Sequence, residues 1–500
     1  MKIFFFNNNY RYAAEQILLT LFPNERPEYP DGVPEGDRAE LYLSEGAKNH
    51  TAVCRLYLNG QKFVGRAGFS KSGITDALTG ERYFQRIIKL AFYRAALSSG
   101  VGKPDWGALT GIRPGKLMSK LLETGMSDRA AAAKFIRDYH VSPERARLCL
   151  HTAHAGLECA KSLTARDICL YVGIPFCPTR CAYCSFVSQS VQKSIKLIPE
   201  YLAALRTEIE ATAEAVRSLG LRPISVYFGG GTPTTLSAAQ LDDLCGKLEE
   251  SFDLSSVREY TVEAGRPDTI TAEKLEVLKR HGVTRVSVNP QSMDDEVLKA
   301  IGRRHTARDI VDALATVRAV GDFEVNMDLI AGLPKDTPES FRKTLDAVLG
   351  LRPENITVHT LALKKGSEIM LDGTPRPSAG DVRSMLDYAN GSLFSLGYEP
   401  YYLYRQKYMS GGFENVGWQR GHTENIYNIC IMEELSSIIA MGGGASTKLC
   451  LGNGRIARIF DPKYPAEYIA SIDRIRAGKE RMRALLSGEV LSEDEDAKEV

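Results

Sequence analysis

Three cysteines lie close together near the middle of the chain, as Cys177, Cys181 and Cys184. Their spacing, C-x3-C-x2-C, on an irregular loop after a short apolar run allows the thiolates to converge on a metal or an iron–sulfur cluster. Structural zinc sites use four protein ligands, whereas three protein ligands leave one metal position open. The pattern therefore predicts a [4Fe–4S] cluster with one iron free to bind a small molecule. Three reduced cysteines in a loop, or a zinc site with a distant fourth ligand, are the alternatives.

A glycine-rich turn is the second candidate. Gly229, Gly230 and Gly231 come directly after an apolar run and before Thr232. Glycine lets a ligand approach the backbone closely, and exposed amides there can bind a carboxylate or a phosphate. A tight turn without a ligand is the alternative.

Four further polar residues follow or interrupt other apolar runs: Glu263, Gln291, Arg303 and Asp328. A carboxylate such as Glu263, at the C-terminal end of a strand, can pair with a ligand ammonium group. Asp328 lies inside an apolar run, where a carboxylate is costly unless it is bonded. It is therefore either part of a site or a structural residue satisfied by backbone amides.

Four basic or titratable residues carry weaker signals. Arg113 and Lys116 lie in a turn-rich stretch, where they either contact an anionic ligand or belong to a packed turn between helices. A helix-capping or solvated role and a functional role are both open for His305. His359 falls in an expected strand and is predicted to be a core residue.

Strands and helices alternate regularly between residues 168 and 360, and these elements position the candidates. Strands are expected at 168–174, 223–228, 258–263, 284–289, 323–330 and 355–360, and helices at 196–219, 237–251, 271–281, 294–300, 306–319 and 337–350. Six β/α units with buried-type strands imply an α/β fold with a parallel sheet, closed or partly closed as a barrel. The chemistry of such barrels lies at the C-terminal ends of the strands, so the candidates are expected to surround one barrel mouth.

The length and the change of pattern along the chain predict several domains. Five hundred residues exceed what one core usually holds. We expect an N-terminal α+β and then helical domain over 1–165, the partial barrel over 166–365, and a mixed C-terminal extension over 366–488 that closes the barrel. The acidic end, 489–500, is expected to be a disordered tail.

The composition excludes several classes of protein. A hydrophobic content of 44% and a charged content of 25% are ordinary for a soluble protein, and the net charge of +1 argues against a broad nucleic-acid footprint. Neither a signal-peptide core nor a run of 18 apolar residues is present. The ten cysteines are too few for a disulfide framework in so long a chain, so we expect a cytoplasmic protein with reduced thiols.

The motifs, taken in order, resemble those of the radical S-adenosylmethionine (SAM) superfamily, and within it the oxygen-independent coproporphyrinogen III oxidase group. The shared features are the cysteine signature with Tyr183 before its last cysteine, Gly-Gly-Gly-Thr-Pro-Thr at 229–234, Asp-Glu-Val-Leu-Lys-Ala-Ile-Gly-Arg-Arg-His at 295–305, and Asp-Leu-Ile-Ala-Gly-Leu-Pro at 328–334. The stretches 109–116 and 401–407 are similar to the HemZ-type coproporphyrinogen dehydrogenase branch. The resemblance implies a partial (β/α)6 radical SAM barrel.

The resemblance also implies a role for each matching residue. Cys177, Cys181 and Cys184 would hold the [4Fe–4S] cluster. Tyr171 and Tyr183 would flank the cluster and SAM. The remaining SAM contacts, with Glu263 on its ammonium group, would be Gly230, Gly231, Thr232, Glu263, Gln291, Arg303, Asp328 and Ala362.

The implied reaction is the oxidative decarboxylation of coproporphyrinogen III to protoporphyrinogen IX. An electron donor such as flavodoxin or ferredoxin would reduce the cluster, and a radical derived from SAM would take a hydrogen atom from the β-carbon of a propionate side chain. Loss of one electron, to an acceptor, and of CO₂ would leave a vinyl group, and this would happen at two propionates. Neither nucleic acid nor a membrane span is expected. A substrate with four carboxylates needs basic residues, for which Arg304, Arg405, Lys407 and Arg113 are candidates.

Two departures from the group's pattern favour a second hypothesis, a haem-binding chaperone on the same scaffold. Phe186 stands where the decarboxylases usually carry a further cysteine, and Gly173 stands where they usually carry histidine. Phe186 is shared with the haem chaperones. The His-Asn pair that the chaperones carry before Tyr-Trp is not matched by Glu424-Asn425 and the residues that follow.

Overall fold

The structure is a computed structural model that describes residues 1–32, 35–74, 76–111, 113–184, 189–190, 195–362, 375–405, 412–452 and 454–489. Phe186, Lys407 and the end of the acidic tail, 490–500, lie outside the described residues. Two compact units make up the chain. One contains residues 1–150 and 405–413, and the other contains 151–404 and 414–500.

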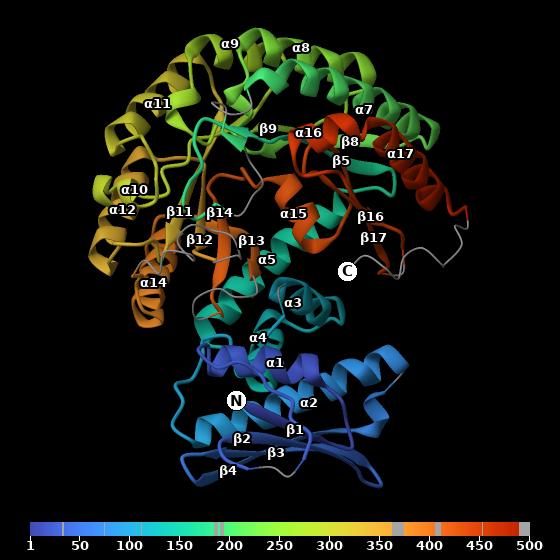
Figure 1. Cartoon of the computed structure of the whole chain (residues 1–500), viewed down its shortest axis with the longest axis vertical. Coiled ribbons are helices and arrows are strands. Elements are labelled where there is room, and N and C mark those ends of the chain that lie inside the picture. Colours follow the sequence, from blue (N-terminus) through green and yellow to red (C-terminus); the bar gives the residue numbers. More distant parts are fainter. Residues whose placement is uncertain are drawn as a thin grey trace. The chain divides into compact units, whose positions relative to one another are not determined.

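The N-terminal unit is a four-stranded sheet with helices on one face (Figure 1). Its strands are β1 (Lys2–Phe6), β2 (Arg38–Glu45), β3 (Asn49–Leu58) and β4 (Gln61–Ser70), and its helices are α1 (Arg11–Leu21), α2 (Ala77–Ser98), α3 (Pro114–Glu123) and α4 (Asp128–Tyr139). Strands β2 to β4 are antiparallel, whereas β1 is parallel to β2. Helix α2 packs directly on β4, because a Cβ at Gly65 would lie 2.0 Å from the carbonyl oxygen of Ala91.

The larger unit contains an eleven-stranded sheet in the order β13-β14-β12-β11-β10-β9-β8-β5-β15-β16-β17. Its central, parallel part consists of β5 (Asp167–Ile174), β8 (Arg222–Gly230), β9 (Glu259–Val262), β10 (Arg285–Ser287), β11 (Glu324–Ala331) and β12 (Asn355–Thr360). These are the six strands that the sequence predicts, in the predicted parallel order, so the partial barrel is confirmed.

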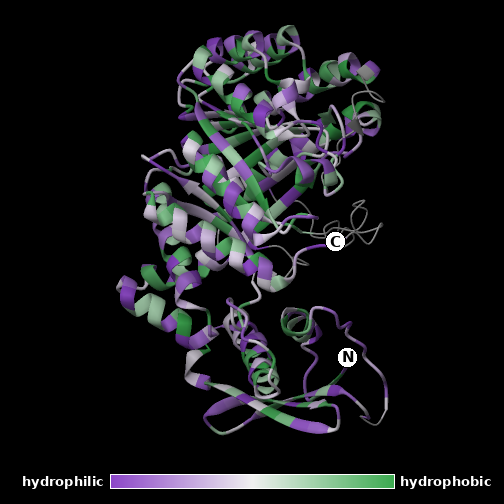
Figure 2. Cartoon of the chain, turned by 90° about the vertical axis from the view of Figure 1, so that its left-hand side faces the viewer, coloured by the Kyte–Doolittle hydropathy of each residue, from purple (hydrophilic) through white to green (hydrophobic). Residues whose placement is uncertain are grey.

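Helices cover the outer side of this parallel sheet, as the arc of α7 to α12 in Figure 1 shows. They are α7 (Ile198–Ser218), α8 (Ala238–Ser251), α9 (Ala272–Arg280), α10 (Asp295–Ala300), α11 (Ala307–Val320) and α12 (Pro338–Leu351). The serine or threonine that precedes α8, α9, α11 and α12 accepts a backbone amide of the first turn, which explains where these helices begin. Apolar strands lie inside and polar helix surfaces outside (Figure 2).

The C-terminal segment contributes strands as well as helices. It contains α14 (Ala379–Ser395), β13 (Glu399–Arg405), β14 (Glu414–Gln419), α15 (Ile426–Glu433), β15 (Ser437–Gly442), β16 (Ser446–Cys450), β17 (Ile456–Phe460), α16 (Pro465–Ala470) and α17 (Ile472–Ser487). Strand β15 is parallel to β5 and β14 is antiparallel to β12, so both ends of the six-stranded sheet are extended. The charged sequence at the end of this segment forms two helices, α16 and α17, which are separated at Ser471.

A buried ion pair joins the last helix to the barrel. Lys479 of α17 lies 2.6 Å from the carboxylate of Glu208 of α7, and neither side chain is more than 3% exposed. Glu208 also accepts the amide of Gly442 at the end of β15, at 2.8 Å. No helix in the described ranges is both long enough and apolar enough to span a bilayer.

Candidate functional site

The cysteine loop begins where β5 ends, at Ile174. Cys181 is buried and Cys177 and Cys184 are partly exposed. Two backbone contacts fix the loop: the amide of Cys184 donates to the carbonyl of Cys181 at 3.0 Å, and the amide of Ala182 donates to Ile301 at 3.1 Å. The thiols are therefore held on an ordered loop at the C-terminal end of the first barrel strand.

The residues around this loop suit an anionic thiolate cluster. Burial opposes the charge of Arg303, but Tyr183 and the thiols of Cys181 and Cys177 raise the pKa of its guanidinium above its ordinary value. Within the described ranges, no three Cys, His, Asp or Glu side chains surround one common metal-ion position. In a [4Fe–4S] cluster each thiolate binds a different iron, so its three sulfurs need not surround one ion. Three thiols beside a buried cation are thus a donor set that fits the cluster.

The glycine turn packs against the cysteine loop. A Cβ at Gly231 would lie 2.5 Å from the carbonyl oxygen of Phe176, so only glycine fits there. The amides of Gly231 and Thr232 donate to the carbonyls of Ile174 and Phe176, at 2.8 and 2.7 Å. The expectation that these amides are exposed for a ligand is wrong for Gly231 and Thr232, because the loop already accepts them. The Thr232 hydroxyl lies 3.4 Å from the sulfur of Cys177.

Glu263 follows β9 at the same mouth and is partly buried beside aromatic rings. Tyr227 of β8 donates to its carboxylate at 2.6 Å. The rings of Tyr171 and Tyr227 and the Glu263 carboxyl carbon all lie within 3.3 Å of where a Cβ of Gly229 would stand. Burial is the main cause that raises the pKa of Glu263 to about 7, and Asp328 adds to it. In the described part of the chain no cationic side chain lies within hydrogen-bond distance of this partly buried carboxylate, which is thus suited to pair with a ligand ammonium group.

Asp328 of β11 is bonded by side chains. Asn326 donates to it at 2.8 Å, and the Nε2 of His359 lies 3.8 Å away. Burial opposes its charge, but His359 and then Asn326 lower the pKa of Asp328. The alternative that backbone amides satisfy Asp328 is therefore wrong. The prediction that His359 is a core residue is also corrected, because its side chain is 27% exposed and faces Asp328.

The other predicted residues lie around the same strand ends. Gln291 has a left-handed backbone conformation, with φ +65°, and its amide donates to the carbonyl of Asp328 at 2.9 Å. Arg303 donates to the hydroxyl of Tyr183 and to the carbonyl of Gly265, both at 3.2 Å. Ala362 lies two residues beyond the end of β12. The structure thus brings the cysteine loop, Glu263, Asp328, Gln291 and Arg303 to one edge of the sheet.

His305 has neither the helix-capping role nor the solvated role that the sequence left open. Thr306 caps α11 through its hydroxyl, and His305 itself is buried. Burial, followed by the charges of Arg303 and Arg266, lowers its pKa to about 4, so it is neutral at pH 7.

Three of the basic candidates, Arg113, Lys116 and Arg405, lie in the N-terminal unit. Arg113 immediately precedes α3, on which Lys116 lies. Arg405 is buried, and its guanidinium donates to the carbonyls of Leu109 and Gly412. The guanidinium of Arg405 is thus engaged in hydrogen bonds to backbone carbonyls.

Sequence reasoning missed Tyr427, which completes the aromatic wall of the site. Its ring is stacked 4.4 Å from that of Tyr227 and 6.0 Å from that of Tyr171. Tyr427 belongs to the short helix α15, far along the chain from β5 and β8. No local pattern marks it, because the stack depends on where α15 is held.

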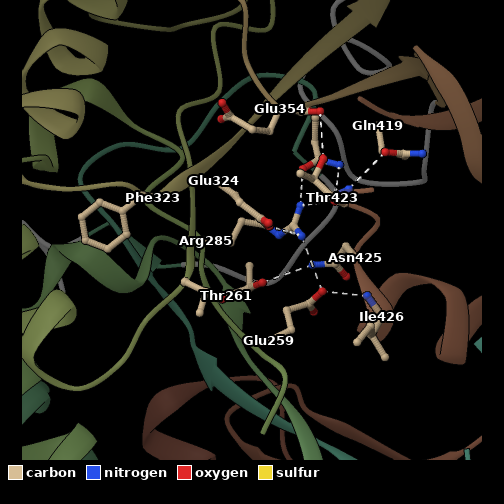
Figure 3. A network of polar contacts seen from close by, with 12 residues as sticks. Glu259, Thr261, Arg285, Phe323, Glu324, Glu354, Gln419, Thr423, Asn425 and Ile426 are labelled. Atoms are coloured by element: carbon tan, nitrogen blue, oxygen red, sulfur yellow. Dashed lines mark hydrogen bonds and ion pairs between the residues drawn. The ribbon is translucent and has the colours of Figure 1, made fainter. Parts of the chain in front are cut away.

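A buried polar network at the N-terminal ends of the strands holds α15 in place (Figure 3). Glu259 of β9 accepts the amides of Ile426 and Tyr427, at 2.7 and 3.4 Å. Arg285 of β10 donates to the carbonyl of Thr423 at 2.9 Å and lies 3.7 Å from Glu259. Glu259 thus caps the helix that carries Tyr427, at the opposite end of the strands from the cysteine loop.

Comparison with known proteins agrees with this geometry. The model of the radical SAM superfamily matches residues 171–348. The oxygen-independent coproporphyrinogen-III oxidase-like protein HemZ of Bacillus subtilis is 42% identical over 369 residues, which cover 73% of this chain and 74% of that protein. The haem chaperone HemW of Haemophilus influenzae is 28% identical over 302 residues, covering 60% and 75% of the two chains.

A solved structure supports the same conclusion. The coproporphyrinogen III oxidase HemN of Escherichia coli, a radical SAM enzyme, superposes with a TM-score of 0.52 and 26% identity, over 64% of this chain and 72% of that one. The chain therefore belongs to the radical SAM superfamily, whose members use a [4Fe–4S] cluster and SAM, and within it to the group of the HemN oxidase, the oxidase-like protein HemZ and the HemW chaperones.

Proposed function

We propose that this protein oxidatively decarboxylates two propionate side chains of coproporphyrinogen III and so forms protoporphyrinogen IX. The observation that carries the proposal is the meeting of the cysteine loop, Glu263 and Asp328 at one barrel mouth, with a wall of stacked tyrosines beside them. The 42% identity to the HemZ oxidase-like protein, over most of both chains, supports it.

The residues of the chain have distinct roles on this proposal. When bound, the cluster supplies the electron that cleaves SAM and so provides the radical that takes hydrogen from a propionate. Cys177, Cys181 and Cys184 hold the cluster, and flavodoxin or ferredoxin is the proposed donor of the electron. Glu263 binds the SAM ammonium group, which brings a positive charge next to this carboxylate.

The remaining contacts orient the cofactor and exclude water. Tyr171 and Tyr183 flank the cluster, and Gly230, Gly231, Thr232, Gln291, Arg303, Asp328 and Ala362 complete the SAM site. The Tyr171–Tyr227–Tyr427 stack forms an apolar surface against which cofactor and substrate lie without bulk water.

A haem chaperone is the second candidate, favoured by the identity to HemW and by Phe186. The segment that aligns with the chaperones' His-Asn pair supports the enzyme instead. Asn425 accepts the amide of Asn428 as the cap of α15 and donates to the hydroxyl of Thr261 at 3.1 Å. Its side chain is buried in these structural bonds, and glutamate replaces the histidine before it.

An anaerobic assay separates the two candidates. Reconstituted protein is incubated with SAM, a reductant or reduced flavodoxin, and coproporphyrinogen III. Formation of protoporphyrinogen, CO₂ and 5′-deoxyadenosine supports the oxidase, and Cys181→Ala should abolish all three products. Tight haem binding without release of CO₂ would establish the chaperone and reject the oxidase.

A further inference from the structure

Arg266 is a buried arginine between two segments of the site and has no role in the function proposed above. It lies in the turn between β9 and the short helical turn Pro267–Thr269, and its side chain is 3% exposed. Its Nε and Nη2 donate to the two carboxylate oxygens of Asp268, at 3.0 and 3.1 Å. This bidentate contact fixes the plane of the guanidinium.

The third nitrogen of this guanidinium holds the cysteine loop. Nη1 of Arg266 donates to the hydroxyl of Thr179 at 2.7 Å, and Thr179 lies between Cys177 and Cys181. Arg303 holds the second half of the loop in the same way, through the hydroxyl of Tyr183. The two arginines therefore bind the loop on both sides of its central cysteine.

These contacts form a closed ring of hydrogen bonds. Arg303 also donates to the carbonyl of Gly265, directly before Arg266, at 3.2 Å. The amide of Ala182 donates to Ile301, two residues before Arg303. The cysteine loop, the turn after β9 and the segment before α11 thus fix one another, and loss of one member loosens the loop.

The charge of Arg266 has a second consequence. Its partner Asp268 has a side chain 40% exposed, so water screens the carboxylate more than it screens the buried guanidinium. His305, which also lies beside Arg266 and Arg303, is kept neutral and adds no positive charge. Besides the exposed Arg180 of the loop itself, the positive charges that contact the loop are therefore those of the two arginines. A positive charge near an iron–sulfur cluster favours its reduced form, which is more negative by one electron.

We propose that Arg266 is a positioning residue of the cluster: through Thr179 it holds the first half of the cysteine loop, and its charge favours the reduced state. This role depends on the cluster common to the superfamily, and not on which porphyrin reaction follows. Removal of a polar group that orients a metal ligand typically lowers the metal affinity about 10- to 100-fold.

Two substitutions separate the hydrogen bond from the charge. Thr179→Val removes the hydrogen bond and keeps the charge, whereas Arg266→Gln removes both. Arg280→Gln, on the outer helix α9 with a side chain 60% exposed, is the matched control. Each full-length protein is reconstituted anaerobically; iron retention against a chelator and the midpoint potential by redox titration are then measured.

We expect both Thr179→Val and Arg266→Gln to retain iron about 10- to 100-fold less well than the control. Only Arg266→Gln should shift the midpoint potential to a more negative value. Equal iron retention in Arg266→Gln and the control would overturn the positioning role, and an equal potential would overturn the effect of charge. If far-UV circular dichroism shows that Arg266→Gln does not fold, Arg266→Lys replaces it: weaker iron retention with an unchanged potential supports the proposal, and unchanged retention refutes it.

Discussion

Substitution of Glu263 by glutamine should stabilise the unliganded protein and weaken SAM binding. The pKa of Glu263 rises from an ordinary 4.5 to about 7, chiefly because the carboxyl is buried. A rise of this size means that ionising the side chain in the fold costs about 3 kcal/mol more than in the unfolded chain. Glutamine keeps the shape and can still accept the Tyr227 hydrogen bond, but it carries no charge.

The sign of the pH dependence follows from the direction of the shift. Below pH 4.5 Glu263 is protonated in both the folded and the unfolded chain, and it costs nothing. As the pH rises from 4.5 through about 7, the unfolded chain releases the proton first and stability is lost. Glu263→Gln should therefore match the unmodified protein near pH 5 and exceed it at pH 8 by about 3 kcal/mol in the free energy of unfolding.

Denaturant unfolding at pH 5.5 and pH 8, with SAM binding measured by calorimetry on cluster-loaded protein, tests both parts. Loss of the carboxylate should cost about 2–5 kcal/mol of SAM binding energy, because the SAM ammonium group is left unpaired in a buried site. The exposed residue Glu276 provides the control, Glu276→Gln, which should change neither quantity. A Glu263→Gln protein that is less stable than the unmodified one at both pH values would refute the reasoning.

Three further predictions concern other groups in the larger unit. Cys181→Ala should abolish the visible absorbance of the reconstituted cluster, and unchanged absorbance would show that the ligand assignment is wrong. Arg285→Gln leaves Glu259 unpaired in the network that caps α15, so the free energy of unfolding should fall by about 3–5 kcal/mol in denaturant titration. Lys479→Met should lower the free energy of unfolding by a similar amount, about 3–5 kcal/mol, because it removes the ammonium group that pairs with Glu208, whose side chain is 0% exposed. The control Arg476→Met, on the exposed face of α17, should leave the free energy of unfolding unchanged.

The barrel and the strand-end residues could be predicted because both depend on local pattern. Apolar strands and amphipathic helices alternate between 168 and 360, and parallel strands place their C-terminal ends at one edge of the sheet. Glu263 follows from this rule alone, whereas Asp328, within β11, is marked by its charge in an apolar run. The three thiols are recognisable because their spacing in the chain is also their spacing on one loop.

The remaining features of the fold and the site depend on contacts between segments that are distant in the chain. Strands β14 and β15 extend the sheet, but their sequences do not say which strand they pair with. Tyr427 joins the aromatic wall only because Glu259, more than 160 residues earlier, accepts its helix amides. The backbone contacts of the glycine turn could not be predicted for the same reason, since the amides of Gly231 and Thr232 donate to carbonyls of a distant segment, those of Ile174 and Phe176.

The distribution of charge around the site constrains how the proposed substrate lies. Glu263 and Asp328 place two carboxyl groups at the same mouth, where the Nε2 of His359 lies 3.8 Å from Asp328. Carboxylates are repelled from such a surface, whereas the ammonium group of SAM is attracted to it. On the proposed function, coproporphyrinogen III must therefore present one propionate to the SAM side of the mouth and keep its other carboxylates towards the rim. On the same proposal Arg304, an exposed residue after α10, binds these carboxylates.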